Sequence, residues 1–321
     1  MHILITGGAG FIGSHLAEHL LAKEVSLALL DDHSTGQRSN LEAVLKHPRC
    51  TLHEGDVRDE ALVTRAMQGA DAVVHLAAAV GAELVMRSPA RTLDVNVRGT
   101  EVVLETAQKE KPLVFLASSS EVYGRGVHGV QSEEDDLGFG PSTSPRWGYA
   151  CSKALDEWLA FAHAREHGTR VIIGRIFNTT GPRQVGDHGM VLPRFVRAAL
   201  RAEPLRVHGN GAQTRSFIHV LDTVEAIARL LECPAAVGEV VNIGRSEEIS
   251  ILALAKRVLG HTASRSTIEH IPAETSRREG YEDLPRRRPA TAKLLRLTAF
   301  EAQRDLDRII TDCVHEQRAR G

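Results

Sequence analysis

A glycine-rich turn near the N-terminus is the feature that most constrains this chain. The apolar residues 3–5 run directly into TGGAGFIG, and apolar side chains then recur at helical spacing. In the first turn of a helix, unpaired N–H groups and the helix dipole favour an anion such as pyrophosphate, and glycines let the backbone approach it closely. The turn therefore predicts a dinucleotide site made by its glycines and neighbouring residues: Gly7, Gly10, Phe11, Ile12 and Gly13.

An acidic residue at the end of the next apolar run indicates which dinucleotide binds. Asp31 follows VSLALL, and its carboxylate can accept hydrogen bonds from both hydroxyls of an adenosine ribose. Because its charge would repel a 2′-phosphate, we expect NAD rather than NADP. His75 is expected to be a packed side chain rather than a catalyst. The remaining residues of the predicted cofactor site are Asp56, Val57, Leu76, Ala77, Ala78, Asn96, Ser118, Tyr149 and Lys153.

The alternation of strand and helix patterns predicts the fold class. Stretches of helical periodicity separate a series of apolar runs, at 51–57, 71–80, 112–120 and 170–178. This alternation is typical of an α/β chain with a doubly wound parallel sheet of the Rossmann type. The later segments predict a smaller C-terminal lobe that binds substrate. The expected NAD-binding domain covers 1–177 and 216–245, and the expected substrate lobe covers 178–215 and 246–321.

Composition narrows the functional classes. Lys and Arg number 39 against 41 Asp and Glu, a net charge of -2, so no overall field favours nucleic acid or a membrane surface. No leader pattern and no apolar run of membrane-spanning length is evident, and we expect a cytoplasmic protein. The four cysteines lack disulfide or zinc spacing, and His163 and His167 have no third ligand nearby, so no metal is expected.

Two residues on one face of a helical pattern indicate the chemistry. Tyr149 and Lys153 lie four apart in GYACSKALDEWL. A lysine cation, like the positive nicotinamide ring of NAD⁺, favours the tyrosine phenolate. Such a tyrosine can remove the proton of a sugar hydroxyl while hydride leaves the same carbon. Ser119, at the end of the run 112–120, can hold that hydroxyl in place.

Nearly the whole chain resembles the extended short-chain dehydrogenase/reductases that modify nucleotide sugars. The resemblance rests on motifs that include TGGAGFIGSHL, GDVRD, NVRGT, SEVYG, YACSK, RIFNTTGPRQ and AQTRSFIHVLD. It implies that NAD stays bound while the sugar C4 hydroxyl is oxidised, with Ser119, Tyr149 and Lys153 as the catalytic trio. One departure is a shortened connection, LLAKEVSLALLDD, without the usual glycine between the first helix and the second strand. This departure leaves the end of that helix open.

The resemblance also implies contacts to substrate and to a second subunit. Residues that match the family's contacts to the nucleotide diphosphate or the sugar are Asn178, Arg183, Arg215 and Arg287. Many relatives form homodimers through a four-helix interface, and GTEVVLETAQ with ALDEWLAFAHA could supply the helices. Trp147 either forms a wall of the sugar pocket or is a packed aromatic residue.

The residues after Ser119 distinguish among the reactions of this family. A 4,6-dehydratase carries an Asp-Glu pair there, whereas this chain has Ser120 and Glu121, so dehydration is disfavoured. UDP-glucuronate decarboxylases carry Ser or Thr, then Ser, then Glu, with an arginine two residues before a proline, which Arg287 matches. The stretches GPSTSPRWGYACSK and GYEDLPRRRP also resemble these decarboxylases. We therefore predict a UDP-glucuronate decarboxylase that gives UDP-xylose or UDP-4-keto-pentose.

This hypothesis assigns roles to the predicted catalytic residues. Ser119 holds the C4 oxygen, and Tyr149 is the acid and base. Ser120 and Glu121 lie near C5 and the carboxylate, with Glu121 either protonated or positioning a water that protonates C5 after CO₂ leaves. Arg287 holds the carboxylate or the diphosphate. The alternatives are a 4-epimerase of UDP-glucuronate or UDP-glucose, which leaves Glu121 without a role, and a non-catalytic NAD-binding regulator.

Overall fold

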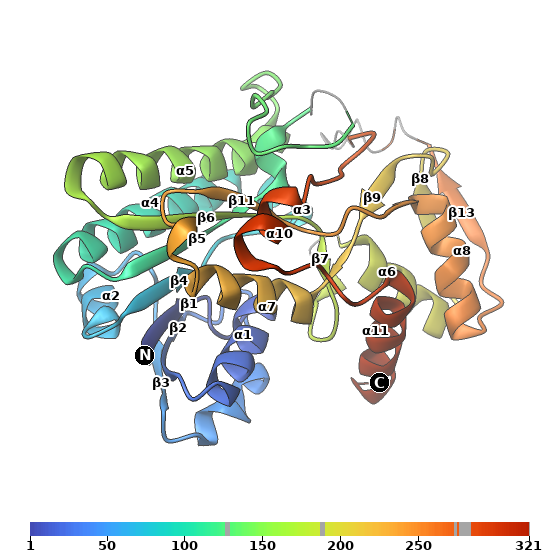
Figure 1. The fold of residues 1–321 in the computed structure, drawn as a ribbon. Helices are drawn as coiled ribbons and strands as arrows, with labels where there is room; N and C mark the ends of the chain where they lie inside the picture. Colours follow the sequence, from blue (N-terminus) through green and yellow to red (C-terminus); the bar gives the residue numbers. More distant parts are fainter. Residues whose placement is uncertain (126–128, 187–189, 273–274, 276–283, 321) are drawn as a thin grey trace.

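A seven-stranded parallel sheet forms the centre of the larger part of the molecule (Figure 1). The structure is a computed structural model, and it describes residues 1–125, 129–186, 190–272, 275 and 284–320. The strand order is β11-β6-β5-β4-β1-β2-β3. In chain order the strands are β1 His2–Thr6, β2 Ser26–Asp31, β3 Cys50–Glu54, β4 Ala72–His75, β5 Leu113–Ser119, β6 Arg170–Ile176 and β11 Val240–Ile243.

Helices cover both faces of this sheet. On one face, an apolar core joins the sheet to α1 (Phe11–Ala22), α7 (Val220–Leu231) and α10 (Ala292–Thr298). A second core joins the other face to three helices, α2 (Glu60–Met67), α4 (Pro89–Glu110) and α5 (Gly148–His167). Because the central strands are buried on both faces, they read as continuous apolar runs in the sequence. The doubly wound α/β sheet predicted from the sequence is confirmed.

The order of the strands creates a crevice where β1 and β4 lie side by side. Successive strands run outward from β1 to β2 and β3, and the chain then returns to place β4 on the other side of β1. At such a reversal, the loops after neighbouring strands diverge and leave room for a ligand at the carboxyl edge. The strand predicted at 71–80 ends at His75, and the N–H of Ala77 then donates to the hydroxyl of Thr6 at 3.2 Å.

The shortened connection after α1 is closed by a residue in the left-handed conformation. The helix ends at Ala22, and Glu24 has φ +63°, a region that normally favours glycine. The N–H of Val25 then donates to the carbonyl of Leu20 at 3.2 Å, which starts β2 directly. The missing glycine therefore changes the helix end without displacing the strand that carries Asp31.

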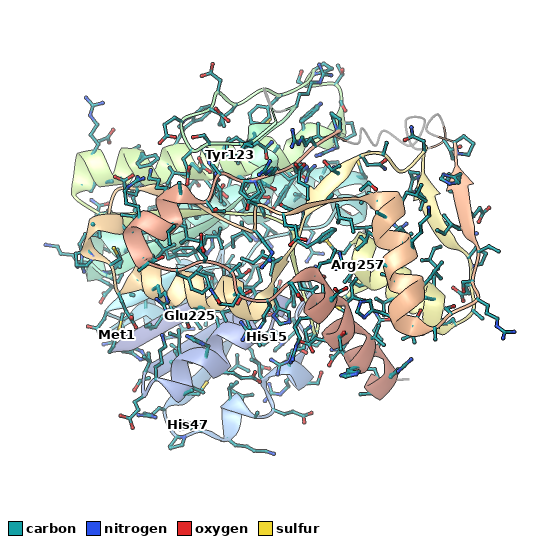
Figure 2. The ribbon with its side chains drawn as sticks, turned by 45° about the vertical axis from the view of Figure 1, so that its right-hand side comes forward. Met1, His15, His47, Tyr123, Glu225 and Arg257 are labelled. Carbon is teal, nitrogen blue, oxygen red and sulfur yellow. The ribbon has the colours of Figure 1, made fainter. Side chains whose placement is uncertain are left out.

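A smaller lobe lies beside the carboxyl edge of the sheet and has its own apolar core (Figure 1). Arg257, which Figure 2 labels, lies in this lobe. It forms an ion pair with Asp307 at 2.6 Å, which links two helices of the lobe. The elements of the lobe are α6 Val191–Leu200, β8 Leu205–His208, α8 Ile251–Thr262, β13 Ile268–Ile271 and α11 Leu306–Arg320. Shorter elements connect or border the two parts, namely α3 Ala82–Arg87, β7 Thr179–Thr180, β9 Thr214–Ser216, β10 Ile218–His219 and β12 Glu248–Ser250.

Candidate active site

A cavity of about 920 Å³ lies at the carboxyl edge of the sheet, and both parts of the molecule line it. All six predicted catalytic residues line this cavity: Ser119, Ser120, Glu121, Tyr149, Lys153 and Arg287. The predicted cofactor residues also line it, apart from Asn96. The structure thus brings residues from the start, the middle and the end of the chain to one site.

The glycine-rich turn forms one wall of the cavity, and its shape fits a dinucleotide. Gly7 has φ +72°. A Cβ atom on Gly13 would lie 2.1 Å from the carbonyl oxygen of Gly7, so no larger residue fits where α1 begins. Gly10 is the N-cap of α1, and no side chain caps the first N–H groups of that helix. An anion can therefore reach the helix N-terminus, as binding of a pyrophosphate requires.

Asp31 is fixed at the end of β2 in the position expected for a ribose ligand. Its carboxylate accepts hydrogen bonds from the N–H groups of Ala9 at 2.9 Å and His33 at 2.8 Å. Burial raises the pKa of Asp31, and these two hydrogen bonds oppose that shift. Carboxylate oxygens have further lone pairs, so Asp31 can still accept from two ribose hydroxyls. The prediction of NAD therefore fits this part of the cavity.

The other predicted cofactor residues divide into two groups. Asp56, whose carboxylate accepts from Arg58 at 2.9 Å, lines the cavity together with Val57, Leu76, Ala77 and Ala78. Asn96 does not line the cavity. Its side chain accepts from the N–H of Ala79 at 2.8 Å and donates to Ser152 at 3.0 Å, so it supports the loop from behind.

Buried hydrogen bonds fix two residues at the ends of the strands. Ser118 lines the cavity and donates to the buried carboxylate of Glu157, which Arg175 holds at 2.8 Å. His75 is buried between the hydroxyls of Thr6 and Thr100. Burial, and then the nearby Lys153 cation, lowers the pKa of His75 to about 3. The histidine is thus a neutral, packed side chain, as expected.

Tyr149 and Ser119 both line the cavity, and their hydroxyls interact with each other. Burial raises the pKa of the Tyr149 phenol, the Glu121 carboxylate raises it further, and the hydrogen bond to Ser119 opposes both. Lys153 donates to Asp156 at 3.0 Å, within the same helix. Burial and the carboxylates thus hold the pKa of Tyr149 above its ordinary value, and the lowering by Lys153 together with the positive nicotinamide ring stays a prediction.

Glu121 lies between two arginine side chains. Nη2 of Arg146 donates to Oε2 of Glu121 at 2.7 Å, and Nη1 of Arg287 lies 2.5 Å from Oε1. Burial alone would raise the pKa of Glu121, but the two guanidinium groups lower it to about 2. The carboxylate is therefore ionised at neutral pH, and the protonated form considered from the sequence does not fit this site. Arg287 contacts Glu121 and lines the cavity as well.

Arg146 was not predicted as a site residue. It lies in the 3₁₀ helix Pro145–Trp147 just before α5, is buried, and has its guanidinium carbon 5.2 Å from the centre of the Trp147 ring. Its position in GPSTSPRWGYACSK, three residues before Tyr149, was the available signal. Trp147 is only 1% exposed and does not line the cavity, so it is a packed aromatic residue.

The predicted substrate residues line the cavity in three different settings. Asn178 donates to the carbonyl of Ser216 at 2.8 Å. Arg215 donates to the carbonyl of Leu284 at 2.8 Å. Arg183 has φ +68° and donates to Ser14 of α1 at 3.2 Å, so its guanidinium lies on the cofactor side, apart from the pair formed by Arg287 and Glu121. Of the stretch GYEDLPRRRP, residues 280–283 lie outside the described residues.

The smaller lobe supplies cavity residues that the sequence did not single out. They come from the start of α6, from β8 and from the segments beside them: Met190, Val191, Leu192, Pro193, Arg194, Arg206, His208, Gln213, Phe217 and Ile251. Among the described residues, and counting Arg87 and Arg91 of the larger part, eight arginines and one lysine line the cavity, against four carboxylates. This excess of positive charge suits ligands with several phosphate or carboxylate groups.

Metal-binding clusters and membrane-spanning helices are both absent from the described part of the chain. It contains no group of three or more His, Cys, Asp or Glu side chains arranged to bind a metal ion. Among its helices, none is long and apolar enough to cross a membrane.

Two curated relatives share most of their length with this chain. It is 38% identical over 298 residues to the UDP-N-acetyl-alpha-D-glucosaminuronate decarboxylase of Bacillus cytotoxicus. The matched residues cover 92% of this chain and 91% of that relative. It is 35% identical over 300 residues to UDP-glucuronic acid decarboxylase 1 of Danio rerio, covering 93% of this chain and 68% of that protein.

A solved structure and a family description complete the comparison. The UDP-glucuronic acid 4-epimerase of Bacillus cereus, in complex with UDP-glucuronic acid and NAD, superposes with a TM-score of 0.89 and 25% identity over 100% of both chains. Residues 3–244 match the NAD dependent epimerase/dehydratase family. With the glycine-rich turn and Asp31 placed at one edge of a doubly wound sheet, the chain belongs to the NAD-dependent epimerase/dehydratase family.

Proposed function

We propose that this protein is an NAD-dependent UDP-glucuronate decarboxylase. The observation that supports this most is the Glu121 carboxylate between Arg146 and Arg287, next to the hydroxyls of Ser119 and Tyr149. Oxidation at C4 needs only the serine, the tyrosine and the lysine. The additional charged cluster is explained by a substrate whose C6 carries a carboxylate.

The first step is removal of hydrogen from C4 of the sugar. Tyr149 takes the proton of the C4 hydroxyl, and Ser119 holds the oxygen through a hydrogen bond. Bound NAD⁺ would supply the hydride acceptor, held by the glycine turn and Asp31. Lys153, which lines the cavity one helical turn after Tyr149, would donate to a ribose hydroxyl.

The second step breaks the bond between C5 and the carboxylate carbon. With a ketone at C4, the C6 carboxylate belongs to a β-keto acid, and the electron pair of the breaking bond moves onto the C4 oxygen as CO₂ leaves. Hydrogen bonds from Ser119 and from protonated Tyr149 stabilise that oxygen. A proton then adds to C5. The product is UDP-4-keto-pentose, or UDP-xylose if hydride returns to C4.

The charges around Glu121 fit this second step. Two guanidinium groups meet at this cluster, and guanidinium groups form bidentate, charge-assisted hydrogen bonds with carboxylates. The ionised Glu121 can position a water molecule that protonates C5, but it cannot act as the proton donor itself at neutral pH. Nearby Ser120 is buried and lines the cavity.

The assembly is also part of the proposal. We infer a homodimer through α4 and α5, which pack on each other and carry exposed apolar side chains, with Trp158 60% exposed, Leu93 41% and Leu155 40%.

The division into domains is part of the proposal as well. Segments 178–215 and 246–321 would form the lobe that binds the nucleotide sugar, and segments 1–177 and 216–245 would form the NAD domain. The arginine-rich lining supports a nucleotide diphosphate as part of the ligand.

The test is incubation of the purified protein with NAD⁺ and UDP-glucuronate, followed by mass spectrometry of the nucleotide products. Loss of the mass of CO₂ supports the proposal, and NADH accumulation shows whether the ketone is released. An unchanged mass with a new C4 epimer by NMR favours a 4-epimerase, consistent with the superposition on that class. A parallel reaction with UDP-N-acetylglucosaminuronate tests the substrate named for the relative from Bacillus cytotoxicus. Stoichiometric NAD without turnover of any UDP-sugar would favour a regulator.

A further inference from the structure

A buried carboxylate contacts the ammonium group of Lys153 from inside the protein. Nζ of Lys153 lies 3.0 Å from Oδ2 of Asp156, and the two side chains are 3% and 0% exposed. Lys153 lines the cavity, whereas Asp156 is not among its lining residues. The carboxylate therefore meets the lysine on the side away from a ligand and is not itself placed to touch one.

Among the groups around this pair, Asp156 is the carboxylate that pairs directly with the Lys153 ammonium. Burial raises the pKa of Asp156, and the Lys153 ammonium opposes that shift by favouring the carboxylate. Thr100, whose hydroxyl lies 3.2 Å from Nε2 of His75, carries no charge. His75 is neutral, because burial lowers its pKa to about 3. Glu157, the next residue, is engaged by Arg175 at 2.8 Å. None of these neighbours offers Lys153 an ion pair as close as Asp156 does.

We propose that Asp156 is a positioning residue that offsets the Lys153 charge and keeps Tyr149 protonated until a positive nicotinamide ring lies beside the phenol. This rests on the roles proposed above for Tyr149 and Lys153. An ammonium group favours a nearby phenolate, but a carboxylate 3.0 Å from that ammonium cancels much of its field. The phenol could then lose its proton only when the second positive charge arrives.

The other charged groups near Tyr149 act in the same direction or are already paired. Glu121, in the segment after β5, is ionised and disfavours the Tyr149 phenolate. Asp156, in α5, also disfavours it. Arg146 and Arg287 face Glu121. His75, on β4, carries no charge at neutral pH. Lys153, one helical turn after Tyr149, is thus the cation whose charge Asp156 offsets.

The experiment is a spectroscopic pH titration of tyrosine in the protein without NAD. Asp156→Asn and, as a second variant with no new hydrogen-bond donor, Asp156→Ala remove the carboxylate. We expect the pKa of the Tyr149 phenol to fall by roughly one unit in each. The chain has three tyrosines, and burial raises the pKa of Tyr123 to about 12, so its signal overlaps that of Tyr149. Subtraction of the same titration of Tyr149→Phe isolates the phenol of interest.

A matched control removes the same charge elsewhere on the helix. Glu166 is exposed in the last turn of α5, and Glu166→Gln should leave the titration unchanged. In the enzyme with NAD, the limb of the rate profile that rises with pH should move to lower pH in the Asp156 variants, because the phenol loses its proton more readily. An unchanged or higher phenol pKa in folded Asp156→Asn or Asp156→Ala would overturn the proposal. The titration needs no substrate, so its outcome is independent of whether UDP-glucuronate is decarboxylated.

Discussion

The guanidinium of Arg287, from the C-terminal part of the chain, lies 2.5 Å from the carboxylate of Glu121, just beyond the end of β5. Arg146 contacts the other oxygen of the same carboxylate at 2.7 Å. Three separate segments thus meet at one anion beside the predicted catalytic tyrosine.

Replacement of Glu121 by Gln should slow CO₂ release from UDP-glucuronate by about 10²-fold or more, because the neutral amide neither balances the arginines nor orients water as a base would. Bound NAD, measured after denaturation, should remain at the wild-type level, since Glu121 lies at the sugar end of the cavity in our proposal. Glu110→Gln, at the exposed end of α4, is the control. Wild-type CO₂ release by Glu121→Gln would contradict the proposed role of this cluster.

The Glu121 cluster should also make folding stability depend on pH. Because the folded pKa of Glu121 is about 2 and the ordinary value is 4.5, its contribution is fully present above the ordinary pKa and is lost as the pH falls toward 2. The shift corresponds to an upper limit on the order of 3 kcal/mol. Urea unfolding should show wild type losing its advantage over Glu121→Gln as the pH falls below about 5. A constant difference across this range would show that ionisation of Glu121 does not stabilise the fold.

Replacement of Gly13 by Ala should weaken NAD binding by about tenfold or more, because a Cβ atom would lie 2.1 Å from the carbonyl oxygen of Gly7 and displace the turn. Calorimetric titration with NAD⁺ measures the change. Gly260→Ala in α8 is the matched control, since its added Cβ meets no atom within 4 Å. This control should bind NAD normally and unfold no more easily than wild type. Normal NAD affinity in folded Gly13→Ala would place the cofactor elsewhere.

Replacement of Trp158 by Asp should convert the proposed dimer into monomers. The side chain is 60% exposed on α5, and a charge at the centre of an apolar interface carries a large desolvation cost. Sedimentation velocity at several protein concentrations measures the change in mass. Leu295→Asp, at a 43% exposed position on α10, should leave the mass unaltered. Wild type that sediments as a monomer would exclude this interface.

Local patterns were enough to predict much of the site. The glycine-rich turn, Asp31 at the end of a strand, and the spacing of Tyr149 and Lys153 each depend on residues close in sequence, where the geometry of a turn or a helix fixes the arrangement. The alternating patterns likewise predicted the parallel sheet, because a strand buried on both faces requires a continuous apolar run.

The sequence by itself thus determined the fold class, and it predicted six catalytic residues that the structure brings to one cavity. Only the tertiary structure decided which charges meet: Arg146 and Arg287 on Glu121, Asp156 on Lys153, and Arg183 on α1 rather than beside Arg287. It also placed Asn96 behind the cavity wall. The physical reason is that ionisation and side-chain direction depend on burial and on groups brought together by long-range packing, which no local spacing encodes.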